Sequence, residues 1–228
     1  MSVMKINVFA HNKPWGRKSY DDLNKKVPGD WVFISSQAEL DNLDLTSIET
    51  IFFCHWSNLV SKEILQKVRC ICFHMTDLPY GRGGSPLQNL ILQGKTKTIL
   101  SAIEMEESLD TGPIFWQLEV DLSGNAESIY ERMTDACWMG ISSILSECPT
   151  ARPQVGSVVN FKRRTAEESE LPKDLPIDKV YDYIRMLDAP GYPNAFLLAN
   201  NIKITFNNSR LDNGKVIAQA IIEVTNEE

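Results

Sequence analysis

The feature that most constrains the fold is a regular alternation of apolar strand-like segments with amphipathic helix-like segments up to about residue 148. The pattern predicts strands at 5–10, 30–36, 50–56, 69–75, 95–105 and 112–122. It predicts helices at 61–68, 86–94 and 126–148. Strands that alternate with helices in this way predict an α/β fold, with a Rossmann-like, mostly parallel sheet and helices on both faces.

The regular alternation of strand-like and helix-like segments ends near residue 148. A charged stretch, NFKRRTAEESEL, is typical of a solvated surface connection. A short helix is predicted at 177–188, and two strand-like segments around the turn DNG (212–214) predict a β-hairpin. We therefore predict a main domain over 1–150, a linker over 151–175, and a small C-terminal α+β subdomain over 176–228.

Composition restricts the partners. The 228 residues carry a net charge of −7 and a pI near 5.1, which argues against a large nucleic-acid footprint but allows a local basic pocket. No signal-peptide pattern and no apolar run of membrane-spanning length is present, so we expect a cytoplasmic protein with no membrane or nucleic-acid partner. Five cysteines, an odd number, predict buried reduced thiols. Because Cys70 and Cys72 lack a second ligand pair, no metal is expected.

One of only three histidines, His74, lies where a buried strand runs into the glycine-rich loop LPYGRGG. It could be a structural histidine, half of a Cys/His metal site, or a proton-transfer group. In open α/β sheets ligands bind at the carboxyl ends of strands, which favours the last of these. A second loop places Asp110 before Thr-Gly-Pro, and a carboxylate beside a histidine is a common arrangement for acid–base catalysis.

These residues resemble a known family. The pattern His-x-Thr-x-Leu-Pro-x-x-Arg-Gly from His74, with the later Leu-Asp-Thr-Gly-Pro-Ile, is similar to the N10-formyltetrahydrofolate-dependent formyltransferase superfamily. The resemblance is good over about 50–148 and continues faintly into the tail. It implies formyl transfer from N10-formyltetrahydrofolate, a cosubstrate, to an amine. It also implies that His74 carries the proton while Asp110 orients and charge-stabilises it.

The sequence departs from the family at Cys72, where the family has an asparagine that hydrogen-bonds the formyl oxygen. A thiol is only a weak donor, so three possibilities stay open. The imidazolium may act with a backbone N–H of the Gly83–Gly84 turn, a water may replace the amide, or Cys72 may be a nucleophile.

The resemblance also implies the binding residues. The cosubstrate site would be formed mostly by backbone at two loops: Trp56, Asn58, Leu59 and Val60, with Glu106 and Glu107. The acceptor site would include Thr76, Arg82, Gly83 and Gly84, and Trp15 in the loop 11–17 could hold a nucleotide base. Each of the three large side chains also has a structural alternative: Trp56 could fill the core, Trp15 could pack on the tail, and Arg82 could be a surface residue that caps the following helix.

The expected acceptor is a nucleotide-linked amino sugar. The short tail, the acidic charge and Cys72 look most like a sugar-nucleotide N-formyltransferase of the pseudaminic acid type, which acts on a UDP-linked 4-amino-4,6-dideoxy sugar. Formyltetrahydrofolate hydrolysis, or transfer to methionyl-tRNA or glycinamide ribonucleotide, remain alternatives. The apolar strands of the tail are candidates for a homodimer surface, because exposed strand edges are usually paired or covered.

Overall fold

A computed structural model describes residues 5–225 of the chain. The chain folds as two compact units, each described separately below. The first unit comprises the residues up to Gly83, Ile99–Val120 and Arg132–Asn160. The second comprises Gly84–Thr98, Asp121–Glu131 and the residues from Phe161 onward. The division therefore crosses the sequence several times, and the domain limits predicted near 150–175 stay a prediction.

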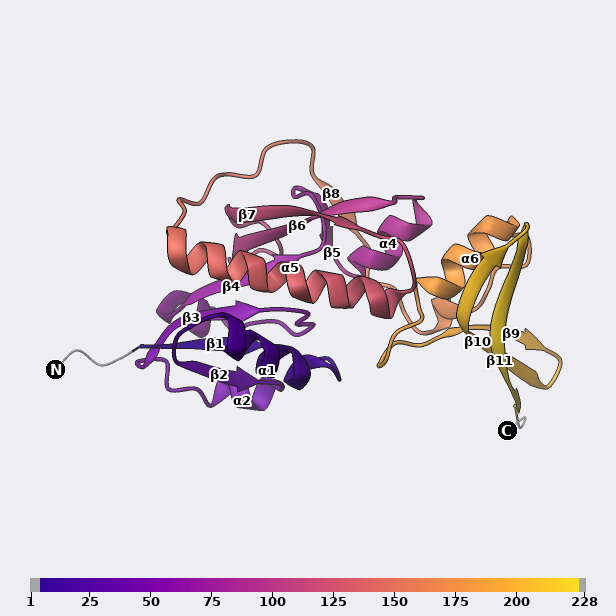
Figure 1. Cartoon of the computed structure of the whole chain (residues 1–228), viewed down its shortest axis with the longest axis horizontal. Coiled ribbons are helices and arrows are strands. Elements are labelled where there is room, and N and C mark those ends of the chain that lie inside the picture. The colour runs from indigo at the N-terminus through magenta and orange to yellow at the C-terminus, as the bar shows by residue number, and fades with distance from the viewer. Residues whose placement is uncertain (1–4, 226–228) are drawn as a thin grey trace. The chain divides into compact units, whose positions relative to one another are not determined.

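The first unit is built on a six-stranded sheet in the order β2-β1-β3-β4-β6-β7 (Figure 1). Its strands are β1 (Ile6–Ala10), β2 (Trp31–Ile34), β3 (Ile48–Phe53), β4 (Arg69–His74), β6 (Lys97–Glu104) and β7 (Ile114–Asp121). Strand β1 pairs in parallel with β2 and β3, and β3 with β4, whereas β6 runs antiparallel to β4. The predicted mostly parallel α/β sheet is confirmed.

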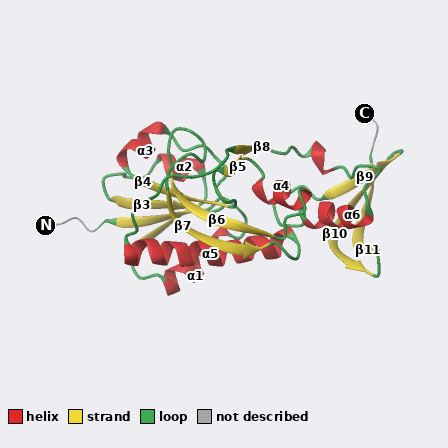
Figure 2. Cartoon of the chain, turned by 90° about the horizontal axis from the view of Figure 1, so that it is seen from above, coloured by secondary structure: helices red, strands yellow, loops and turns green. Residues whose placement is uncertain are grey.

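Helices cover both faces of this sheet. They are α1 (Gly16–Lys26), α2 (Gln37–Asp41), α3 (Lys62–Lys67) and α5 (Ala126–Glu147). Figure 2 shows α1 and α5 along one face and α2 and α3 along the other. On the α2/α3 face, Leu40 and Ile64 pack against Val8, Ile51 and Phe53 of the strands. Both short helices begin at a serine whose side chain accepts a backbone N–H, which defines where each one starts.

Helix α1 was not predicted. The loop expected over 11–17 ends at Gly16, where the helix begins. Within its sequence GRKSYDDLNKK the buried large side chains are Tyr20 and Leu23. Two apolar positions are too few for a clear helical period, so tertiary packing, with Tyr20 against Phe9 of β1, decides the structure here.

The second unit contains α4 (Pro86–Leu92), the 3₁₀ turn η1 (Glu167–Ser169), α6 (Ile177–Arg185) and a sheet in the order β11-β10-β9. Its strands are β9 (Ala195–Ala199), β10 (Ile202–Asp212) and β11 (Lys215–Val224). Strands β10 and β11 pair antiparallel around Asn213 and Gly214, which both have positive φ, as a tight hairpin turn requires. The predicted hairpin is present. Strand β9 was not predicted, since it lies at the end of a Pro- and Gly-rich stretch.

Within the described residues, no helix is long and apolar enough to cross a membrane.

Candidate active site

His74 is the last residue of β4, with 9% of its side chain exposed. Its Nε2 lies 2.8 Å from the carbonyl oxygen of Gly81. A carbonyl can only accept a hydrogen bond, so Nε2 donates and carries a proton. The hydroxyl of Thr76 donates to the same carbonyl at 3.3 Å. The glycine-rich loop thus folds back over the strand that precedes it and fixes the orientation of the ring.

Asp110 lies beside His74, an arrangement that the family resemblance implied. Its Oδ1 is 3.5 Å from His74 Nδ1, and its Oδ2 accepts the backbone N–H of Gly83 at 2.8 Å. The carboxylate is also mostly shielded from solvent, with 10% of its side chain exposed. The backbone of Asp110 is left-handed, with φ of 56°, a conformation that aspartate tolerates better than most residues. The structure therefore brings together an imidazole and a carboxylate in a nearly solvent-free position.

Gln154 is a site residue that sequence reasoning missed. Its Nε2 donates to the carbonyl oxygens of Asp110 at 2.9 Å and Gly112 at 2.8 Å. Its Oε1 accepts from Arg82 Nε at 3.1 Å and Nη2 at 2.7 Å. Arg82, predicted to contact the acceptor, is therefore anchored to the loop that carries Asp110.

The segment around Gln154 contacts both loops of the site. Arg152 exchanges backbone hydrogen bonds with Ile114, just beyond the Asp110 loop. The N–H of Val159 donates to the carbonyl of Pro79, and β8 (Val159–Phe161) pairs with β5 (Tyr80–Gly83). Part of the expected glycine-rich loop is thus a short strand.

Cys72 is partly buried and packs against Leu78, Ile103 and Ile114. Burial raises the pKa of its thiol well above the ordinary value, and the negative charge of Asp110 adds to this effect. The thiol therefore stays protonated at neutral pH, which disfavours the nucleophile reading because thiolates are the reactive form.

The backbone N–H groups of the Gly83–Gly84 turn are already used. Gly83 donates to Asp110, and Gly84 donates to the carbonyl of Phe161 at 3.3 Å. The possibility that this turn supplies the missing oxyanion donor therefore requires one of these bonds to break. A water needs no such rearrangement, and a cationic His74 could act through its charge while its two ring nitrogens keep their contacts with Gly81 and Asp110.

The two loops predicted to hold the cosubstrate share one apolar cluster. Trp56, Val60, Met105 and Cys72 all pack against the core on the α2/α3 face. The indole N–H of Trp56 is buried and has no acceptor among the described residues. An apolar wall with an unused donor suits a flat heteroaromatic ligand.

The remaining predicted cosubstrate residues lie on the surface. Asn58 is exposed, and 82% of Leu59 is exposed. Glu107 pairs with Lys62, the first residue of α3, at 2.7 Å, and Glu106 accepts the hydroxyl of Thr111. Such exposed pairs contribute little stability, so these loops are held mainly by the apolar cluster.

Trp15 lies in a cluster of rings at the carboxyl ends of β1 and β3. Its ring meets those of His11 and His55 edge-on, at centroid distances of 5.7 and 5.8 Å. His11 is fully buried, and burial lowers its pKa to about 4; burial also lowers the pKa of His55 well below its ordinary value. His11 and His55 are therefore neutral at pH 7. The two rings that Trp15 meets, His11 and His55, belong to the loops that follow β1 and β3.

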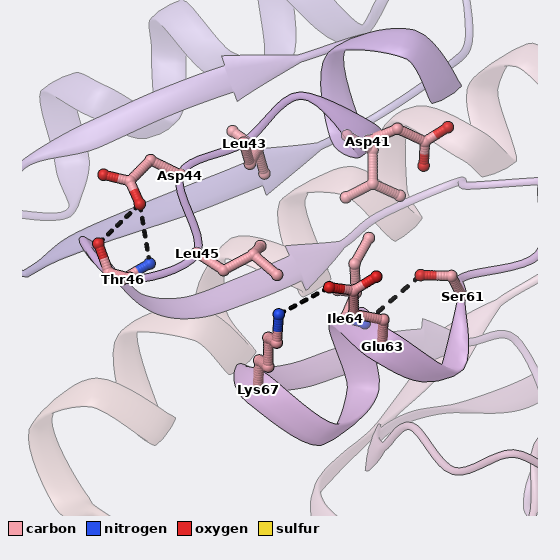
Figure 3. A pocket seen from close by; sticks show the side chains of 10 residues that line it. Asp41, Leu43, Asp44, Leu45, Thr46, Ser61, Glu63, Ile64 and Lys67 are labelled. Carbon is pink, nitrogen blue, oxygen red and sulfur yellow. Dashed lines mark hydrogen bonds and ion pairs between the residues drawn. The ribbon is translucent and has the colours of Figure 1, made fainter.

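A pocket of about 650 Å³ lies elsewhere in the first unit, between α2, the following loop and α3 (Figure 3). Its charged groups are already paired: Asp44 accepts from Thr46, and Glu63 pairs with Lys67. None of the predicted site residues lines it. The residues that the structure describes include no group of three or more histidine, cysteine or acidic side chains placed to hold a metal ion.

Comparison with known proteins identifies the family. Residues 33–144 match the family described as formyl transferase, and residues 166–223 match the methionyl-tRNA formyltransferase C-terminal domain. A solved structure of a methionyl-tRNA formyltransferase from Clostridium thermocellum is 39% identical, with a TM-score of 0.92, and the match covers 97% of this chain and 100% of that one. The chain belongs to the formyl transferase family.

Two other similar proteins match this chain over only part of their length or at low sequence identity. A methionyl-tRNA formyltransferase from Sulfurimonas denitrificans is 28% identical over 182 residues, which are 76% of this chain but 60% of that protein. The chain thus spans less than two thirds of the length of this curated relative. A 4-N formyltransferase from Francisella tularensis is 18% identical, with a TM-score of 0.64 over 99% of this chain and 100% of that one, which shows a shared fold alone.

These findings correct the predicted partners. The expectation of a nucleotide-sugar partner and no nucleic acid is wrong, because the closely similar proteins are named for action on methionyl-tRNA. The error has a physical origin: a net charge of −7 averages over the whole surface and cannot exclude binding at one local region. The predicted homodimer stays a prediction.

Proposed function

We propose that this chain transfers the formyl group of N10-formyltetrahydrofolate to the amino group of methionyl-tRNA. The observation that carries the proposal is the buried pairing of His74 with Asp110 at the end of β4. The Clostridium thermocellum relative, matched over 97% of this chain, supports the choice of acceptor.

The geometry assigns roles to the two ring nitrogens of His74. Because Nε2 is committed to the Gly81 carbonyl, Nδ1 is the nitrogen that can accept a proton from the attacking amine. Asp110, 3.5 Å from Nδ1, would stabilise the imidazolium that forms. The proton can then pass to the departing folate nitrogen as the bond from that nitrogen to the formyl carbon breaks. A positive ring beside the tetrahedral oxyanion lowers the barrier further.

The cosubstrate would lie against the apolar cluster of Trp56, Val60 and Met105, which borders Cys72. Cys72 shares its strand with His74, two residues away and on the same face. A heteroaromatic ring on this cluster would therefore lie next to the residues that handle the proton. The unused N–H of Trp56 is a candidate donor to a ring carbonyl or nitrogen.

The test is incorporation of a labelled formyl group from N10-formyltetrahydrofolate into charged methionyl-tRNA. We expect label in methionyl-tRNA, none in uncharged tRNA, and none with a His74→Asn variant that keeps its melting temperature. Binding of the cosubstrate without any labelled tRNA would exclude this acceptor. Release of formate in the absence of an acceptor would indicate a hydrolase instead.

A further inference from the structure

Gln154 turns inward from a segment that otherwise faces solvent. Between residues 152 and 160, all of which the structure describes, every residue except Gln154 is exposed. Its amide has two N–H donors and an oxygen with two lone pairs, and each has a partner. Carbonyls only accept and a guanidinium only donates, so the orientation of the amide is unambiguous. An amide that makes four hydrogen bonds within an otherwise exposed segment indicates that Gln154 holds specific groups in place.

The two sides of that amide hold two different parts of the site. The nitrogen side holds the carbonyls of Asp110 and Gly112 and so restrains the left-handed backbone that aims the Asp110 carboxylate. The oxygen side holds Arg82, which follows Gly81, the residue that orients His74. One side chain thus joins the loop that presents the carboxylate to the loop that orients the imidazole.

We infer that Gln154 is a positioning residue that couples Arg82 to the Asp110 loop during formyl transfer. The inference rests on the proposed function for its catalytic consequence, though not for its structural one. An anionic group of the acceptor that binds Arg82 would act on the same amide that restrains Asp110. Acceptor binding and placement of the carboxylate would then be linked through a single side chain.

Substitutions can separate the two sides of the amide. The Gln154→Glu variant keeps an oxygen for Arg82 but loses both donors and sets a carboxylate against two carbonyls. The Gln154→Met variant loses all four bonds at similar length. The Arg82→Met variant removes the guanidinium and leaves the bonds to the Asp110 loop. Gln66→Glu, on the exposed face of α3, is the matched control for an added charge.

The first measurement is amide hydrogen exchange of Gly83, whose N–H donates to Asp110 Oδ2, in the protein without ligands. We expect its exchange to become about tenfold faster or more in both Gln154 variants, because the loop that carries Asp110 loses its restraint. Arg82→Met should speed exchange by a smaller factor, because it frees one side of the Gln154 amide, and Gln66→Glu should leave exchange unchanged. Unchanged exchange in Gln154→Met would overturn the inference, whether or not the chain formylates methionyl-tRNA.

The second measurement is turnover with the acceptor. In Gln154→Glu we expect kcat to fall about 10- to 100-fold with a smaller change in the KM of the acceptor, since a misplaced carboxylate affects the chemical step. Arg82→Met should mainly raise KM. The acid limb of the kcat–pH profile should move in Gln154→Glu, which a loss of folded protein alone would not cause. A wild-type kcat in Gln154→Glu would contradict the inference, while absence of turnover in the wild type would instead contradict the proposed acceptor.

Discussion

His74 and Asp110 meet through the ring nitrogen that the Gly81 carbonyl leaves available. Nδ1 of His74 lies 3.5 Å from Asp110 Oδ1, while Nε2 donates to Gly81 at 2.8 Å. These two contacts distinguish the ring nitrogens: Nε2 keeps its proton on the Gly81 carbonyl, and Nδ1 is the nitrogen that can gain or lose a proton. The same carboxylate accepts the Gly83 N–H, so the two loops that build the site restrain each other.

Replacing Asp110 by asparagine should lower the rate of formyl transfer about 100-fold or more. The amide oxygen can still accept the Gly83 N–H, so the loop should keep its conformation, but the negative charge that stabilises the imidazolium is lost. Single-turnover formylation at saturating acceptor measures the effect. A melting temperature equal to that of the wild type is the control, and an unaltered rate would remove Asp110 from the mechanism.

Replacing Cys72 by alanine should leave most of the transfer activity, because the raised pKa keeps the thiol protonated and unreactive. Cys72→Asn should hold or increase activity, since it adds an amide donor next to the reacting carbonyl. Initial rates of formyl transfer test both variants. Mass spectrometry of the wild-type protein, quenched with acid during turnover with excess cosubstrate, tests for a formyl group on Cys72. A covalent formyl adduct on wild-type Cys72 together with an inactive alanine variant would restore the nucleophile reading.

Replacing Gly112 by alanine should lower the free energy of unfolding by about 3 kcal/mol. A Cβ at this position would lie 1.9 Å from the carbonyl oxygen of Glu104, so backbone must move. Gly214→Ala is the matched control: it has positive φ but open space around it, and should cost only about 1 kcal/mol. Urea unfolding of both variants gives the comparison, and equal losses would show that the contact at Gly112 relaxes easily.

Stability should fall as the pH drops from 6.5 towards 4, because His11 has a folded-state pKa of about 4. In that range the unfolded chain binds more protons than the folded chain, so the free energy of unfolding rises with pH and the contribution is complete above 6.5. Between pH 7.5 and pH 5 this histidine should account for about 2 kcal/mol.

The His11→Gln variant cannot titrate and tests this linkage. Its loss of stability between the two pH values should be smaller than that of the wild type by the same amount. His55, whose pKa burial also lowers, should retain the remaining dependence. If the variant and the wild type lose equal stability on acidification, then His11 is not buried in the neutral form.

Much of the fold could be predicted because its elements carry their own periodic signals. The helix predicted at 126–148 is Ala126–Glu147, and the strand predicted at 69–75 is Arg69–His74. The proximity of His74 and Asp110 was implied by the family resemblance alone. The order of strands does not predict it, because β6 runs antiparallel to β4 and its carboxyl end lies beside Ile71 rather than His74. Strand β9 could not be predicted, because its structure depends on pairing with β10 rather than on its own sequence.

Gln154 could not have been found in the same way. Its neighbours Pro153 and Gly156 indicate an irregular segment, and no period connects it to the site. What places it is a set of hydrogen bonds between one side chain and loop carbonyls distant in sequence, and such bonds leave no pattern along the chain. The partners were misjudged for a different reason: a net charge sums over the whole surface and does not locate a local binding region.

The stretch from Arg152 to Asn160 is mostly exposed, yet hydrogen bonds attach it to the site at three points: Ile114, Asp110 and Pro79. A recombinant fragment that stops at residue 150 would contain His74, Asp110 and the strands of the six-stranded sheet, but it would lack these hydrogen bonds. Expressed with ten more residues, it would regain them. A fragment designed to keep the complete site should therefore extend past α5 and include residues 151–160, although most of these residues are exposed.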